Sequence, residues 1–150
     1  GLEYRYDIIQ MTNTFDAHRL AKWANQFGKE DLITNRLMKA YFTDGLNIAD
    51  HQTLENLAKE VGLNELEAHD VLASDQYKDQ VVNEQQESRQ LGVQGVPFFV
   101  LNRKYGISGA QQKEYFTQAL NQIWQEEKPL ESLDGADAEA ACDDHGECGF

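Results

Sequence analysis

Proline and cysteine are both scarce in this sequence of 150 residues, which contains two of each. The two cysteines are Cys142 and Cys148, and the sequence has no Cys-x-x-Cys motif. No stretch approaches the roughly 20 apolar residues that a membrane-spanning helix requires. A glycine-rich phosphate loop and a Gly-x-Ser-x-Gly nucleophile motif are also missing, so the sequence gives no support to a phosphate-loop protein or an α/β-hydrolase.

Positively charged residues are also few. The 13 Lys and Arg residues face 26 Asp and Glu residues, which gives a net charge of −13. The electrostatic field of so acidic a protein repels nucleic acid and anionic membranes, so we expect neither as a partner. Nine of the acidic residues and a single lysine lie in residues 126–150, where large apolar side chains are few. We therefore expect residues 126–150 to form an acidic, flexible tail.

Apolar residues recur at intervals of three and four through the first 92 residues, which is the period of amphipathic helices. The expected helices extend from Asn13 or Thr14 to Phe27, over 30–44, over 50–61, over a short stretch capped by Asn64, and from Asp75 to near Gly92. Residues 96–101 then form a continuous apolar run, which predicts a strand. The pattern continues with a turn at 102–104, a second strand at 105–108 and a final amphipathic helix over 109–124. The fold class expected is α+β, mostly helical.

Pro97 directly precedes the residues of the first predicted strand. Proline has no backbone N–H to donate to a sheet, so it is tolerated at the first residue of a strand. This local explanation accounts for Pro97 without any functional role.

Two stretches resemble one known family. The sequence GVQGVPFFVLNRKYGISGAQ, residues 92–111, resembles the end of a DsbA-family thioredoxin-like domain. The sequence NTFDAHRLAKWA, residues 13–24, resembles the start of the helical insertion in the FrnE-like branch of that family, which is related to 2-hydroxychromene-2-carboxylate isomerases and kappa-class glutathione transferases. The resemblance implies the C-terminal part of a DsbA-type thioredoxin-like fold, with a helical insertion, one β-hairpin and a final helix.

The same resemblance implies a division of the chain into four parts. Residues 1–10 would end the N-terminal thioredoxin-like part, and residues 11–92 would form the helical insertion. Residues 93–125 would supply the terminal hairpin and helix, followed by the acidic tail at 126–150.

The resemblance also implies roles for four residues. The Val96–Pro97 peptide bond would be cis and would lie beside a redox-active dithiol. The backbone of Val96 would pair with an extended substrate, which Pro97 would help to position. Asn13 and His18 would approach the substrate from the helical side, although by their local sequence Asn13 is first a helix cap and His18 is more often a buried core histidine.

The family places a Cys-x-x-Cys motif at the start of a helix, and this sequence lacks it. We therefore expect the chain to be a fragment of a protein whose N-terminal segment carries the dithiol. The implied function is that of a thiol–disulfide oxidoreductase acting on a protein thiol or disulfide or on a small thiol, with no cofactor. The FrnE-like resemblance implies a cytoplasmic protein, and a dimer is possible.

Two other functions remain open. A glutathione-dependent isomerase or transferase has Ser in place of the first Cys and would use glutathione. An acidic metal-binding or chaperone-like domain would need no dithiol at all.

The cysteines of the tail are separated by five residues. The resemblance favours Cys142 and Cys148 as an auxiliary redox pair, because FrnE-like proteins carry a second cysteine pair near the C-terminus. The neighbouring acidic side chains should raise the thiol pKa and weaken either cysteine as an attacking nucleophile. The alternatives are a zinc site formed by Cys142, His145 and Cys148, whose spacing of three is regular, and two thiols without a role.

Overall fold

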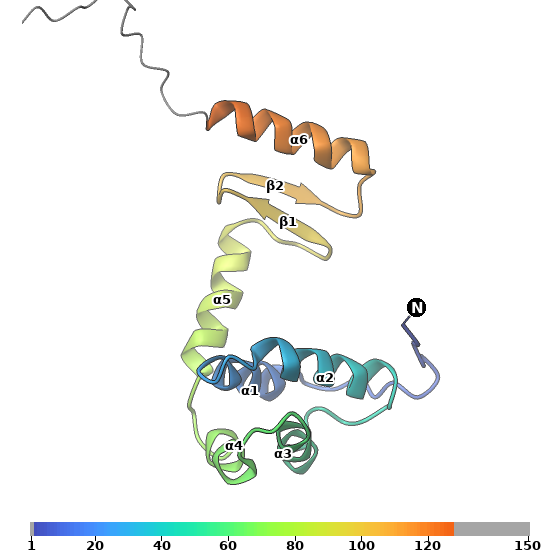
Figure 1. Ribbon diagram of the computed structural model, residues 1–150, viewed down its shortest axis with the longest axis vertical. Helices are drawn as coiled ribbons and strands as arrows, with labels where there is room; N and C mark the ends of the chain where they lie inside the picture. Colours follow the sequence, from blue (N-terminus) through green and yellow to red (C-terminus); the bar gives the residue numbers. More distant parts are fainter. Residues whose placement is uncertain (1, 128–150) are drawn as a thin grey trace, which may run out of the picture. The chain divides into compact units, whose positions relative to one another are not determined.

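The computed structural model describes residues 2–127, and the predicted fold class is confirmed by a mostly helical chain with one two-stranded sheet (Figure 1). The elements are α1 (Phe15–Asn25), α2 (Glu30–Phe42), α3 (His51–Glu60), α4 (Glu65–Leu72), α5 (Lys78–Gln90), β1 (Phe98–Leu101), β2 (Tyr105–Ser108) and α6 (Lys113–Glu126). The chain divides into two units, one through Ile107 and one from Ser108. Among the helices of residues 2–127, none combines the length and the apolar character that crossing a bilayer requires.

The core of the first unit is a bundle in which α1 packs against the four helices α2 to α5. Helix α3 also packs against α2 and α4. The largest side chains that are fully buried come from the first three helices, and they are Leu20, Ile33, Leu54 and Leu57. Burial of these apolar side chains supplies the main driving force for the bundle.

The predicted apolar face of α1 is confirmed except at its end. Leu20 and Ala24 are fully buried, but the side chain of Phe27 is 47% exposed. Helix α1 ends at Asn25, and Gly28 then adopts a φ of 65°, so Phe27 leaves the helical face before the predicted end. The ring of Phe27 instead lies edge-on to that of Trp23, with 5.3 Å between the ring centroids.

The predicted cap of the fourth helix is confirmed. The side-chain oxygen of Asn64 accepts hydrogen bonds from the backbone N–H groups of Leu66 and Glu67. This satisfies two of the donors that the first turn of α4 leaves without a helical partner.

The hairpin follows the predicted pattern, with a turn over residues 102–104 between β1 and β2. Asn102 and Arg103 have positive φ angles of 51° and 53°. A side chain at Gly106 would crowd the ring of Phe98, because a Cβ atom there would lie 2.8 Å from it. Strand β1 begins at Phe98, so Pro97 lies one residue before the strand and not at its first position.

A histidine–carboxylate pair links α3 to α4 and predicts a pH-dependent stability. Nδ1 of His69 lies 2.8 Å from Oε1 of the buried Glu55, and this hydrogen bond, followed by the charge of Glu55, raises the pKa of His69 above its ordinary value of 6.5. A folded pKa above the unfolded one means that the pair stabilises the fold fully below pH 6.5. The stabilisation is lost as the pH rises through the raised pKa of His69.

We therefore expect the free energy of unfolding, measured by urea denaturation, to fall from pH 6.5 upward. His69→Gln should remove this part of the pH dependence, because glutamine does not titrate. The matched control is His18→Gln, since the exposed His18 side chain makes no hydrogen bond to another described residue. An equal loss of pH dependence in both variants would contradict the assignment to His69.

Candidate functional site

The segment before β1 presents its backbone to solvent. Helix α5 ends at Gln90, Gly92 turns the chain with a φ of 77°, and Val96 is then 91% exposed. The Val96–Pro97 peptide bond is cis. Among residues 2–127, the backbone N–H and C=O groups of Val96 have no hydrogen-bond partner. A polypeptide bound here could pair with both groups.

Strand β1 extends this surface. Within the described residues β1 pairs only with β2, so its other edge faces no strand. Phe99 and Val100 of β1 are 41% and 38% exposed. A strand edge that faces no other strand is a template for the addition of an extended chain.

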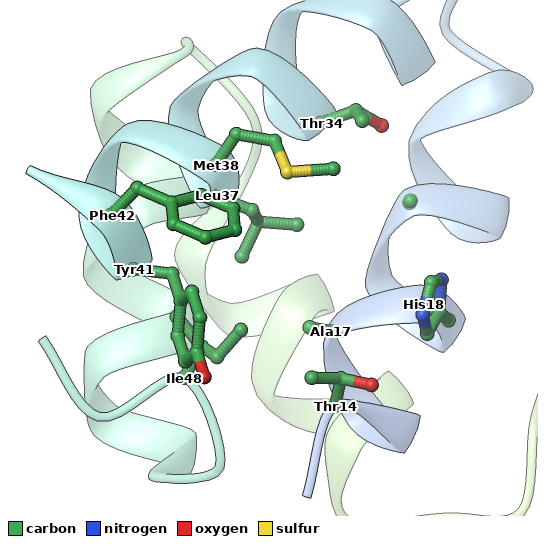
Figure 2. Close-up of a pocket in the computed structure, with 10 residues that line it drawn as sticks. Thr14, Ala17, His18, Thr34, Leu37, Met38, Tyr41, Phe42 and Ile48 are labelled. Carbon is green, nitrogen blue, oxygen red and sulfur yellow. The ribbon is translucent and has the colours of Figure 1, made fainter. Parts of the chain in front are cut away.

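A second candidate site is an apolar pocket between α1 and α2, with a volume of about 260 Å³ (Figure 2). Its walls come from both helices and from the loop after α2. The lining residues are Thr14, Ala17, His18, Ala21, Thr34, Leu37, Met38, Tyr41, Phe42 and Ile48. None of the ten is a carboxylate, a lysine or an arginine.

His18 lies in this pocket wall, and its interpretation as a buried core histidine is wrong. Its side chain is exposed, whereas its neighbours Ala17 and Arg19 are buried. The reason is the turn of the helix, which directs Ala17, Leu20 and Ala24 into the core and leaves the position of His18 outside it. An exposed imidazole without a partner in the described residues is available to a ligand.

Asn13 lies one position before Thr14, the N-cap residue of α1, and its side chain still satisfies one donor of the first turn. Its side-chain oxygen accepts a hydrogen bond from the backbone N–H of Phe15 at 2.9 Å. Asn13 is exposed and does not line the pocket, so the structure does not bring it together with His18 there. Its role in substrate binding stays a prediction.

Arg19 is next to His18 in sequence, but its side chain is buried and hydrogen-bonded within the fold. It is only 4% exposed, and its guanidinium donates hydrogen bonds to the carbonyl oxygens of Val71, Ser74 and Gln76. It also donates to Asp16 at 2.8 Å. The sequence cannot reveal this structural role, because all three carbonyl partners lie more than 50 positions away.

The carboxylate of Asp16 lies between the side chains of Arg19 and His51. Oδ1 accepts from Arg19, and Oδ2 lies 2.9 Å from Nε2 of His51. Burial raises the pKa of Asp16, but the hydrogen bonds from Arg19 and His51 outweigh it and leave the pKa below its ordinary value. Asp16 therefore acts as an anion that fixes these two side chains.

The residues predicted in the tail, Cys142, His145 and Cys148, lie outside the described residues. Over residues 2–127, no group of three or more His, Cys, Asp or Glu side chains is arranged to hold a metal ion. The tail cysteines consequently remain a sequence-based hypothesis.

A comparison with models of known protein families shows the family of this chain. A family model described as the DSBA-like thioredoxin domain matches residues 1–121. The chain belongs to this family. The predicted resemblance to the DsbA family is thus confirmed, and the match does not distinguish the branches of the family.

Two solved structures resemble this DsbA-like domain. One is named as a probable DsbA oxidoreductase from Streptomyces coelicolor, with 40% sequence identity and a TM-score of 0.77. The match covers all of the present chain and 63% of that structure, so the chain spans less than two thirds of its length. The other is named as a candidate protein disulfide isomerase from Nitrosomonas europaea, with 20% identity and a TM-score of 0.66 over 83% of the present chain and 66% of that structure, and it supports the fold alone. A comparison with curated proteins found no match.

Proposed function

We propose that this DsbA-like domain exchanges disulfides with polypeptide substrates that bind as an extended strand at Val96. The observation that carries the proposal is the backbone of Val96, which is exposed and without a partner in the described residues directly before the open edge of β1. Membership of the family and the similarity to a structure named as an oxidoreductase support the class of reaction.

Strand addition explains how such a site can bind substrates of different amino-acid sequence. The N–H of Val96 donates to a substrate carbonyl, and its C=O accepts from a substrate N–H. Pro97 has no N–H, so Val96 supplies the last donor before the strand. Main-chain hydrogen bonds of this kind do not depend on the substrate side chains.

Exchange itself requires a thiolate that attacks one sulfur of a disulfide, so that a mixed disulfide forms and the other sulfur leaves as a thiolate. These 150 residues contain no Cys-x-x-Cys dithiol. Cys142 and Cys148 then form the auxiliary pair. Their two thiols become one disulfide as a substrate disulfide becomes two thiols, so electrons and protons balance.

The test compares the reduced chain with a synthetic peptide of residues 139–150, which carries the same two thiols without the domain. The substrate is an extended peptide that contains a disulfide, and its reduction is followed by mass spectrometry. We expect the chain to react faster than the tail peptide, because binding at Val96 raises the local substrate concentration. Val96→Pro should lower the rate by about 2–10-fold, which corresponds to one lost hydrogen bond.

The matched control is Val96→Ala, which keeps the backbone N–H and should retain the rate. Replacement of both Cys142 and Cys148 by Ser should abolish the reaction. Equal rates for the chain and the tail peptide would contradict the proposed substrate site. An equal loss in Val96→Ala and Val96→Pro would contradict backbone pairing as its basis.

A further inference from the structure

The end of α1, the helix α4 and the residues that precede α5 line a pocket of about 290 Å³, which we call the α1–α4 pocket. All of its lining residues belong to the first unit of the chain, and the function proposed above does not involve them. Pockets for drug-sized ligands usually have about 300–1,000 Å³, so the ligand of this pocket is small. We infer that the α1–α4 pocket binds a small quaternary ammonium ion that also carries a hydrogen-bond acceptor. The inference concerns binding alone and does not rest on disulfide exchange.

Three aromatic rings line the α1–α4 pocket. The rings of Trp23 and Phe27 lie at 76° to each other with 5.3 Å between their centroids, so they form a corner. The third ring is that of Tyr77, whose hydroxyl accepts a hydrogen bond from the side chain of Gln26. The faces of aromatic rings attract cations, and a group of such rings is the usual way in which proteins recognise a quaternary ammonium ion.

Two carboxylates also line the α1–α4 pocket. Glu67 and Asp70 are three positions apart on α4, so their side chains lie on the same face of the helix. Both are exposed, and neither forms an ion pair with another described residue. Two carboxylates are too few for a metal site, and no group of three or more His, Cys, Asp or Glu side chains within residues 2–127 is arranged to hold a metal ion. The combination of rings and carboxylates therefore favours an organic cation.

The cationic side chains near the α1–α4 pocket have other partners. No lysine, arginine or histidine lines it. The guanidinium of Arg19 bonds to the carbonyl oxygens of two lining residues, but it is buried and Asp16 balances its charge at 2.8 Å. Lys29 lines a neighbouring pocket, where its ammonium donates to the carbonyl oxygens of Val61 and Gly62. The negative charge of the α1–α4 pocket thus stays available to a ligand, and the net charge of −13 adds to the attraction of a cation.

The indole N–H of Trp23 provides a donor in the same pocket. Trp23 is only 3% exposed, and its N–H has no hydrogen-bond partner among the described residues. No side-chain nitrogen or oxygen of these residues is both sealed from solvent and without a partner, so the indole nitrogen reaches accessible space. Trp23 lines the α1–α4 pocket and neither of the other two pockets described above, so its N–H faces this one. A ligand oxygen that accepts from this N–H satisfies a donor that the fold leaves without a partner.

The experiment titrates the full chain, labelled with ¹⁵N, with choline and with 3,3-dimethylbutan-1-ol. The second compound has the shape and the hydroxyl group of choline but carbon in place of its charged nitrogen, so the difference between the two measures the effect of the charge. Choline should bind about 10- to 50-fold more tightly, through the rings and the carboxylates together. The sequence has two tryptophans, and choline should shift the indole N–H signal of Trp23 and leave that of Trp124 unchanged. Trp124→Phe assigns the two signals.

Two variants test the walls of the pocket. Asp70→Asn removes one charge, and Phe27→Leu keeps an apolar side chain but removes a ring. Each should weaken the binding of choline by about threefold or more and leave the binding of the neutral analogue unchanged. The matched control is Asp31→Asn on α2, which removes the same charge from an exposed residue that lines none of the three pockets.

Equal binding of choline and the neutral analogue would overturn the inference, as would shifts confined to residues outside the pocket. An equal loss in Asp70→Asn and Asp31→Asn would also overturn it, because the net charge alone would then attract the cation. A quaternary ammonium group is also the end of a trimethylated lysine side chain, so acetyl-trimethyllysine-amide is titrated in parallel. Tighter binding of choline supports a free ion as the ligand, and tighter binding of the lysine derivative would overturn that assignment.

Discussion

Replacement of Arg19 by methionine is expected to lower the free energy of unfolding by about 3–5 kcal/mol. Methionine fills a similar volume but leaves the carbonyl oxygens of Val71, Ser74 and Gln76 without their donor. It also removes the closer partner of the Asp16 carboxylate. Each buried acceptor that loses its hydrogen bond costs about 1–3 kcal/mol.

Thermal and urea unfolding of Arg19→Met measure this effect, and the midpoint temperature should fall by roughly 10 °C for a chain of this size. The free energy of unfolding of Arg19→Lys should lie between that of the unsubstituted chain and that of Arg19→Met. One ammonium keeps the charge but cannot reach all four oxygens in the geometry of a guanidinium. Arg89→Met is the matched control, because Arg89 is exposed near the end of α5. If Arg19→Met were as stable as Arg89→Met, the buried network would contribute nothing to stability.

Leu20→Ala is expected to have an effect of similar size, about 3–5 kcal/mol. Leu20 has no exposed surface and lies on α1, the helix that packs against α2, α3, α4 and α5. The loss combines the transfer free energy of the deleted methyl groups with the cavity that the bundle cannot close. Urea denaturation, with an unchanged slope against denaturant concentration, measures it.

The control for this change is Leu66→Ala on α4. The side chain of Leu66 is 76% exposed, so the same substitution should change stability by no more than about 0.5 kcal/mol. A small effect at Leu20 would mean that α1 is not the centre of the core.

The sequence predicted most of the helices and both strands, because their signals are local. The apolar residues of α1 and α3 repeat with the helical period, and Asn64 caps α4 within three residues of its own position. The hairpin could be predicted equally well from the sequence, since the change in pattern at β1 and the turn at 102–104 are short-range features.

The start of α5 could not be predicted in the same way. The polar sequence from Asp75 is compatible with a helix, but α5 begins only at Lys78 after Tyr77, which has a positive φ of 61°. Arg19 binds the carbonyl oxygens of Ser74 and Gln76, so these groups are occupied by a residue from α1. A contact across 55 residues overrides the local preference.

For the candidate sites, too, some features followed from the sequence and others only from the tertiary structure. The sequence by itself determined the family, through the stretch around Val96 and Pro97 and the stretch that opens α1, because short motifs need no knowledge of the packing. Only the tertiary structure decided that His18 is exposed, that Arg19 is buried and that α1 and α2 enclose a pocket. Burial and cavities depend on which helix covers which face, and that arrangement is set by contacts between residues far apart in the chain.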